Sequence, residues 1–166
     1  MGVRFVSFVG RSNCGKTTLI THLIPILSRK NLKIGSIKHT HHQAEFDKPG
    51  KDSWQHRKAG SQQVLLMSDN QLALYADRPP QLTLKESVHH WFSDFDLVIS
   101  EGFKNEPGLK IEVFRQSTGK QPLYPDPAFE INALVSDQKP DGQIQFFRFE
   151  DIEKISDWIL SKTGLK

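Results

Sequence analysis

Short apolar segments and amphipathic stretches follow one another along the chain. Segments with β-branched and aromatic residues predict strands, and they cover residues 3–9, 33–38, 94–102, 109–115 and 131–137. Apolar residues at helical spacing predict helices over 16–29 and 149–162, and further helices are expected over 51–59 and 82–92. Because strands alternate with helices, we expect an α/β fold with a mostly parallel sheet and helices on both faces.

Two apolar segments, 62–68 and 71–76, flank the turn-favouring pair Asp69-Asn70 and predict an added β-hairpin. Both segments carry apolar residues at consecutive positions, so some of them must lie on each face of the ribbon. An isolated hairpin is marginally stable, and an exposed apolar edge invites pairing with another chain. We therefore expect the hairpin at 62–76 to meet its counterpart in a homodimer. The alternative is that it covers the edge of its own sheet.

The chain has 166 residues, which suits a single domain over 1–166, and a formal charge of +3. Nucleic-acid binders gather Lys and Arg on one face, and this mild, evenly spread charge does not favour such a partner. Cys14 is the only cysteine, so no intramolecular disulfide can form, which fits a reducing compartment. The sequence has neither a signal peptide pattern nor the roughly 20 apolar residues of a membrane helix. We expect a cytoplasmic protein without a membrane partner.

Residues 10–17, GRSNCGKT, match the P-loop pattern G-x-x-x-x-G-K-[ST]. The glycines let successive backbone N–H groups point at phosphate oxygens, and the following helix adds its positive N-terminus. Lys16 can reach the β- and γ-phosphates, and the Thr17 hydroxyl can ligate magnesium. The loop leaves an apolar strand and opens an amphipathic helix, as the motif requires. The sequence therefore predicts a P-loop NTPase fold that binds a nucleoside triphosphate and Mg²⁺.

A P-loop also requires an acidic residue at the end of a neighbouring strand, and residues 95–102 offer two. Asp96 is expected at the N-terminal end of its strand, where it would cap or pair locally. Glu101 is expected at the C-terminal end, where open α/β sheets bind their ligands. We therefore expect Glu101 to act on magnesium with Thr17, directly or through a water, and to be catalytic together with Lys16.

Histidines are concentrated directly after the second predicted strand, in the run KHTHH at 38–42. Three explanations are open: a zinc site, a solvated polar loop, or a loop that faces phosphate or substrate. Structural zinc sites usually include cysteines, and Cys14 belongs to the P-loop. The run leaves the same edge of the sheet as the P-loop, which favours the third explanation.

Several runs, in order along the chain, resemble the molybdopterin-guanine dinucleotide biosynthesis protein B (MobB) family. They are GRSNCGKTTL, IKHTHH, DKPGKDSWQHRKAG, DLVISEGFK and ALVSD, within residues 3–137. The resemblance implies a GTP-binding accessory protein with weak GTPase activity. It also implies a homodimer that works beside the guanylyltransferase that attaches GMP to molybdopterin, with molybdopterin or its guanine dinucleotide as a further partner.

The resemblance assigns site residues in three groups, which are expected to hold GTP and Mg²⁺. The P-loop group is Gly10, Asn13, Gly15, Lys16, Thr17 and Thr18, with Cys14 at a variable position among them. The second group is Lys38, His39, His42, Asp47, Gly50, Lys51, Asp52 and Ser53. The third group is the run Glu101, Gly102, Phe103 and Lys104.

The usual guanine-recognition motif is missing, since neither N-K-x-D nor T-K-x-D occurs in the chain. Asp137, at the end of a predicted strand, offers a carboxylate that can accept from the N1–H and N2–H groups of guanine. A surface turn at Asp137 is the alternative, and the sequence leaves both open.

Two other functions compete with the GTP-binding adapter. A small-molecule P-loop kinase would use residues 103–130 as its lid. Kinases usually place arginines over the transferred phosphoryl group, and this range offers only Arg115. A metallochaperone-type GTPase would use His39, His41 and His42, and would need more Cys or His than this chain provides.

Overall fold

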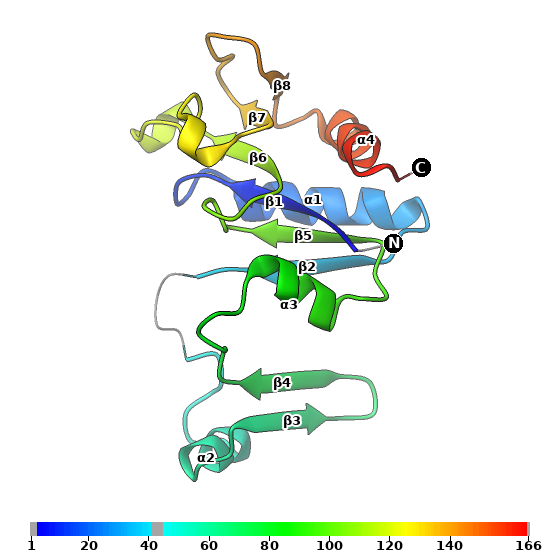
Figure 1. The fold of residues 1–166 in the computed structure, drawn as a ribbon, viewed down its shortest axis with the longest axis vertical. Coiled ribbons are helices and arrows are strands. Elements are labelled where there is room, and N and C mark those ends of the chain that lie inside the picture. The colour runs from blue at the N-terminus through cyan, green and yellow to red at the C-terminus, as the bar shows by residue number, and fades with distance from the viewer. Residues whose placement is uncertain (1–2, 41–44, 166) are drawn as a thin grey trace. The chain divides into compact units, whose positions relative to one another are not determined.

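The computed structural model describes residues 3–40 and 45–165. The chain forms two compact units: a larger unit of residues 1–39 and 83–166, and a smaller unit of residues 40–82. Each unit contains its own sheet (Figure 1). That residues 1–166 fold together as a single domain stays a prediction.

A six-stranded sheet forms the centre of the larger unit, in the order β2-β5-β1-β6-β7-β8. Its strands are β1 (Arg4–Val9), β2 (Ile34–Lys38), β5 (Leu97–Glu101), β6 (Leu109–Phe114), β7 (Ala133–Ser136) and β8 (Gln145–Phe147). Every neighbouring pair is parallel. The carboxyl ends of these strands therefore meet at one edge, which is where open α/β sheets bind ligands.

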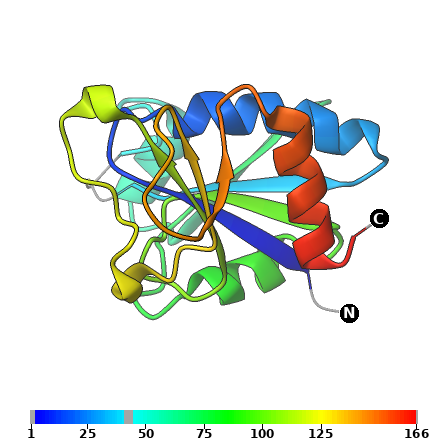
Figure 2. The same cartoon turned by 90° about the horizontal axis from the view of Figure 1, so that it is seen from above.

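Helices cover both faces of this sheet, as Figure 2 shows. They are α1 (Lys16–Arg29), α3 (Leu84–Trp91) and α4 (Ile152–Thr163). Leu23 of α1 and Ile155 of α4 pack in one core cluster with Phe8. Val88 of α3 packs in a second cluster with Val98 of β5, on the opposite face. This arrangement confirms the predicted parallel α/β class.

The face that α3 covers in part also carries buried polar side chains. Ser7 and Ser100 pair across β1 and β5, with their hydroxyl oxygens 2.7 Å apart. Glu112 of β6 is fully buried and accepts hydrogen bonds from the N–H groups of Leu123 (2.6 Å) and Tyr124 (2.8 Å). Glu112 therefore holds the long connection between β6 and β7 against the sheet.

The smaller unit contains α2 (Asp52–Lys58) and an antiparallel hairpin of β3 (Gln63–Met67) and β4 (Leu72–Ala76). The hydroxyl of Ser68 holds the turn by accepting the Gln71 N–H at 3.1 Å. The predicted hairpin is thus confirmed. It forms a two-stranded sheet of its own and does not extend the six-stranded sheet.

Some boundaries differ from those predicted. β8 lies where the sequence predicts no strand, because its three residues are too few for a clear pattern. α3 begins at Leu84 rather than at residue 82 because Thr83 caps it. The Thr83 hydroxyl accepts the Glu86 N–H at 3.2 Å, and the Glu86 carboxylate accepts the Thr83 N–H at 2.8 Å.

Residues 103–130 do not form a separate flap. The range contains β6, which lies between β1 and β7 in the sheet, and two short 3₁₀ turns, Gln116–Thr118 and Pro127–Phe129. A buried central strand cannot open and close over a substrate. The kinase lid over 103–130 is therefore wrong.

Candidate nucleotide-binding site

The Gly10–Thr17 loop connects β1 to α1 and requires glycine at two positions. Gly10 has a φ of 138°, and a Cβ there would lie 2.3 Å from the carbonyl oxygen of Val113. Gly15, directly before α1, has a φ of 97°. Glycine adopts such left-handed conformations without strain and leaves room for the approaching backbone. The loop therefore packs against β6 and leads straight into the N-terminus of α1.

Lys16 is folded back over this loop. Its ammonium donates to the carbonyl oxygens of Arg11 (2.8 Å) and Gly10 (3.2 Å). Cys14 has its sulfur 3.5 Å from Lys16 Nζ, and its side chain is buried in the core. The Cys14 side chain is therefore shielded from a ligand, whereas Lys16 brings a cation to the loop.

Thr17, Lys38 and Glu101 meet at the carboxyl edge of the sheet. The Thr17 hydroxyl lies 2.9 and 3.0 Å from the two carboxylate oxygens of Glu101. The Lys38 ammonium lies 3.3 Å from Glu101 Oε1 and 3.4 Å from Thr17 Oγ1. Lys38 and Glu101 are register partners at the ends of β2 and β5. The structure thus brings together three predicted site residues from distant parts of the sequence.

The competing carboxylate, Asp96, lies directly before β5. Its Oδ2 accepts the N–H of Lys33 at 2.7 Å, which is the local pairing expected for it. Glu101 is therefore the carboxylate beside Thr17. Hydroxyl and carboxylate oxygens are ligands that Mg²⁺ prefers, so Thr17 and Glu101 fit a magnesium ion in their chemistry.

His39 and Phe103 form a second contact between the two strand ends. Their rings are in contact, with centroids 4.6 Å apart and planes tilted by 34°. The backbone N–H of His39 donates to the carbonyl oxygen of Glu101 at 2.9 Å. Gly102 between them has a φ of 107°, and a Cβ there would lie 3.1 Å from the Cβ of His39. The predicted KH and EGF runs therefore lie side by side because β2 and β5 are neighbours.

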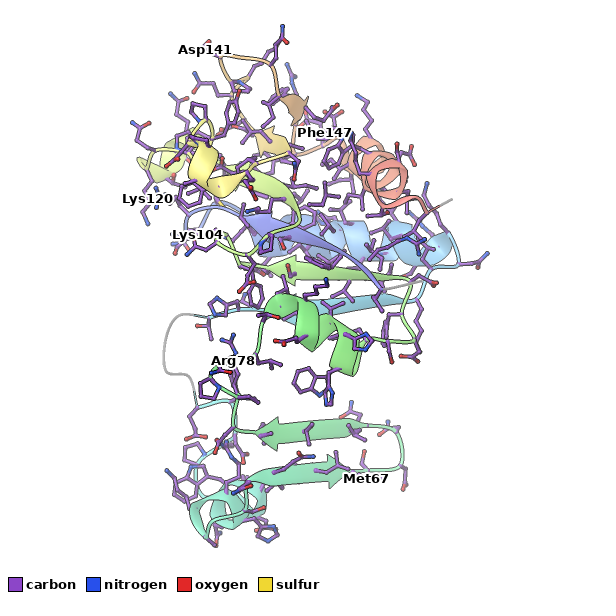
Figure 3. All side chains as sticks on the ribbon, viewed as in Figure 1. Met67, Arg78, Lys104, Lys120, Asp141 and Phe147 are labelled. Atoms are coloured by element: carbon purple, nitrogen blue, oxygen red, sulfur yellow. The ribbon has the colours of Figure 1, made fainter. Side chains whose placement is uncertain are left out.

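Other predicted residues of the larger unit lie further along the same edge. The ammonium of Lys104, labelled in Figure 3, lies 5.7 Å from the ring centroid of Phe129. Asp137 follows β7, and its Oδ1 accepts the N–H of Gln116 at 3.1 Å. Asn13 has a φ of 66° within the loop, and Thr18 is exposed in the first turn of α1.

The predicted residues of the smaller unit take local roles there. Asp47 is buried and accepts the Ser53 hydroxyl at 2.9 Å, Lys51 precedes α2, and Asp52 lies in its first turn. His42 lies outside the described residues. Within residues 3–40 and 45–165, no three His, Cys, Asp or Glu side chains are grouped to hold a metal ion.

Arg115, expected from the sequence only within a lid, lies elsewhere in the structure. Its guanidinium carbon lies 3.7 Å from the ring centroid of Phe149. A Cβ on Gly15 would lie 3.3 Å from Arg115 Nε. Arg115 therefore borders the Gly10–Thr17 loop. No local pattern signals this contact, because Arg115 and Phe149 follow different strands.

A family model described as "Molybdopterin guanine dinucleotide synthesis protein B" (MobB) matches residues 5–137. The chain belongs to the MobB family. The predicted resemblance is thereby confirmed, and family membership places the chain in molybdopterin guanine dinucleotide biosynthesis.

Individual MobB relatives resemble the chain over most of its length. The molybdopterin-guanine dinucleotide biosynthesis adapter protein of Escherichia coli (strain K12) is 35% identical over 161 residues, which are 95% of this chain and 92% of that protein. The Haemophilus influenzae protein of the same name is 40% identical over 119 residues, 71% of this chain and 67% of that protein. A crystal structure of molybdopterin-guanine biosynthesis protein B matches with a TM-score of 0.77 and 31% identity, over 95% of this chain and 99% of that one.

Proposed function

We propose that this MobB-family chain binds GTP and Mg²⁺ at the Gly10–Thr17 loop, hydrolyses GTP slowly, and acts as an adapter in cofactor assembly. The observation that carries the proposal is the 2.9 Å contact between the Thr17 hydroxyl and the Glu101 carboxylate, with the Lys38 ammonium beside both. Two oxygen donors and a cation thus converge on the first turn of α1.

The electrostatics of this region suit a triphosphate. The N-terminus of α1 carries positive partial charge, and the ammonium groups of Lys16 and Lys38 add two cations. Lys16 can exchange its two carbonyl partners for phosphate oxygens, which are stronger acceptors. Thr17 and Glu101 would hold a bound Mg²⁺, Glu101 directly or through a water, and the ion would supply positive charge that offsets the charge of the triphosphate.

The contacts of the nearby lysine and arginine side chains support slow hydrolysis. P-loop enzymes with fast turnover set an arginine against the transferred phosphoryl group. Here the cation beside Glu101 is Lys38. Arg11 donates to the carbonyl oxygen of Gln121 at 3.3 Å, and Arg115 stacks on an aromatic ring. Weak GTPase activity is therefore the most that we expect of this chain as an enzyme.

The adapter role rests on family membership and on the names of the relatives, which are called adapter proteins. We propose that the partner is the guanylyltransferase that attaches GMP to molybdopterin. The adapter would present nucleotide, molybdopterin or the guanine dinucleotide to this enzyme. The kinase alternative loses support because its lid contains a central strand.

We also propose a homodimer formed through the hairpin. Leu65, Met67, Leu72 and Leu74 lie on one face of the ribbon, because β3 and β4 pair Leu65 with Leu74 and Met67 with Leu72. They are 47%, 74%, 64% and 37% exposed, respectively. A continuous apolar face of this kind is typical of a contact with a second protein surface. A second copy of the chain offers the same face, so a two-fold contact buries both.

The remaining expectations concern the membrane, the cellular location and nucleic acid. Within the described residues, no helix combines the length and the apolarity needed to cross a bilayer. The cytoplasmic location and the absence of a nucleic-acid partner stay predictions.

The test of GTP binding is Lys16→Ala. Losing one charge-assisted contact to phosphate costs about 1.5–3 kcal/mol, so GTP affinity should fall roughly 10- to 150-fold. The measurement is isothermal titration calorimetry of GTP with magnesium, with circular dichroism to establish that the variant is folded. Lys85→Ala is the matched control, because Lys85 is exposed on α3. Unchanged GTP affinity in a folded Lys16→Ala protein would falsify the proposal.

A further inference from the structure

Residues from three different loops gather beside Gly15. Arg115 follows β6, Asp137 follows β7 and Phe149 follows β8. A Cβ on Gly15 would lie 3.3 Å from Arg115 Nε and 3.6 Å from Phe149 Cε1, so both side chains border the N-terminus of α1. The guanidinium carbon of Arg115 lies over the Phe149 ring, 3.7 Å from its centroid.

The Asp137 carboxylate is tied to the segment that carries Arg115. Its Oδ1 accepts the N–H of Gln116 at 3.1 Å, and Gln116 directly follows Arg115. The Ser136 hydroxyl lies 3.4 Å from the same oxygen. These contacts orient the carboxylate, and its oxygens retain acceptor capacity, since each carries two lone pairs.

The strand order decides which part of a nucleotide would lie here. Glu101 and Thr17 mark the magnesium and γ-phosphate end of the proposed triphosphate, on the β5 side of β1. β6 and β7 lie on the other side of β1. A triphosphate that runs along the carboxyl edge from Glu101 therefore carries its base toward Arg115 and Asp137.

We propose that Arg115, Phe149 and Asp137 form the base subsite and that this subsite selects guanine. The proposal rests on the proposed triphosphate binding. A planar guanidinium held on an aromatic ring is a platform for a purine base. Asp137 accepts from the N1–H and the 2-amino group of guanine together. Adenine presents a bare N1 and no 2-amino group, so its edge repels the carboxylate.

The first experiment uses the unaltered protein and compares GTP, ITP and ATP by titration calorimetry with magnesium. A bidentate pair of this kind discriminates by roughly 5- to 150-fold, so GTP should bind that much more tightly than ATP. ITP lacks the 2-amino group and should fall between them. Equal affinity for GTP and ATP overturns the base subsite and leaves phosphate binding at the loop intact. Failure to bind any of the three overturns both proposals.

Asp137→Asn tests the carboxylate by inverting its preference. Xanthine carries an oxygen where guanine has the 2-amino group, so the asparagine amide should favour XTP. We expect the XTP-to-GTP affinity ratio to rise about tenfold or more. Asp141→Asn is the matched control, because Asp141 is exposed on the loop between β7 and β8 (Figure 3). An unchanged ratio in a folded Asp137→Asn protein overturns the assignment of Asp137.

Arg115 is tested by a pair of variants that separate its plane from its charge. Arg115→Lys keeps the charge and removes the plane, and Arg115→Ala removes both. Because the plane of Arg115 supports either purine, both variants should lower the affinities for GTP and ATP by a similar factor, roughly 5- to 150-fold, and preserve the preference for GTP. Arg148→Ala, at an exposed neighbour of Phe149, is the control. Full affinity in Arg115→Lys overturns the stacking platform.

Discussion

Glu101 is the residue on which the proposed chemistry most depends, because its carboxylate contacts both Thr17 and Lys38. It ends a buried strand next to the strand that leads into the loop. Position at the strand end, rather than its charge alone, distinguishes it from Asp96. The carboxylate of Asp96, at the other end of β5, accepts the backbone N–H of Lys33.

Glu101→Gln is expected to abolish most GTP hydrolysis and to weaken the magnesium dependence of GTP binding, because the amide keeps the shape and removes the anionic ligand. Phosphate release and GTP titrations with and without magnesium measure the two effects. Asp96→Asn is the control, and it should mainly lower stability through the weaker bond to Lys33. Loss of magnesium dependence in Asp96→Asn instead would show that the wrong carboxylate has been chosen.

Glu112 provides a pH-dependent contribution to stability. Burial raises the pKa of its carboxyl, while the N–H groups of Leu123 and Tyr124 and the charge of Arg11 oppose the shift without cancelling it. A raised folded-state pKa means that the folded chain holds the proton more tightly than the unfolded chain. The stabilisation is therefore complete below the ordinary pKa of 4.5 and is lost as pH rises through the raised value.

Glu112→Gln removes this titration, since glutamine stays neutral. The free energy of unfolding of the unaltered protein, relative to the variant, should fall as pH rises from about 4 and then level off above the raised pKa. Urea unfolding at a series of pH values measures this difference. Glu153→Gln, at an exposed position of α4, is the control for the substitution itself. A flat difference for Glu112→Gln would contradict the expectation.

Among the helices and strands, the predicted and observed bounds agree best where a residue typical of an element's start precedes the element. The predicted helix 16–29 is observed as Lys16–Arg29, because glycine precedes it and buried leucines repeat at helical spacing. The hairpin is equally clear from its turn. What the pattern could not assign is which hairpin residues share a face, since that depends on strand register.

The strand register predicts different effects on dimer formation for substitutions at Leu74 and Leu66. Leu74 belongs to the face of Leu65, Met67 and Leu72, whereas Leu66 points to the opposite face. If the four-residue face forms the dimer contact, Leu74→Glu should give a monomer and Leu66→Glu should remain dimeric. Light scattering at micromolar concentration measures the mass. A monomeric unaltered protein would end the dimer proposal, and a monomer only with Leu66→Glu would move the contact to the other face.

The whole chain is built from two compact units, and the proposed nucleotide site is formed by residues of the larger one. Its loop, helix and strand ends come from segments on both sides of the smaller unit in the sequence. Folding of the larger unit is therefore a precondition for assembling Thr17, Lys38 and Glu101. Ligand binding and stability should be linked for this reason.

GTP with magnesium should stabilise the folded chain by mass action. At a free nucleotide concentration 100 times the dissociation constant, the gain in the free energy of unfolding is about 2.7 kcal/mol. Chemical unfolding at rising GTP concentration measures it. Lys16→Ala at the same concentrations should show little gain. An equal gain in both proteins would indicate binding somewhere other than the loop.

The sequence by itself was sufficient for the features that contiguous residues encode. The GRSNCGKT loop, the helix that follows it, the strand ending at Glu101 and the hairpin turn all have short-range signals, and the ordered runs identify the MobB family. Each signal reflects backbone geometry or burial within a few residues, which chain order alone preserves.

Only the tertiary structure decided which of these features meet. The pairing of β2 with β5 sets Lys38 beside Glu101, and the order β1-β6-β7-β8 brings Arg115 next to Phe149 and Gly15. β8 is too short to be recognised locally and takes its place by pairing with β7. Strand order and register depend on packing of the whole sheet, so contacts between loops at its edge have no signature in any single segment.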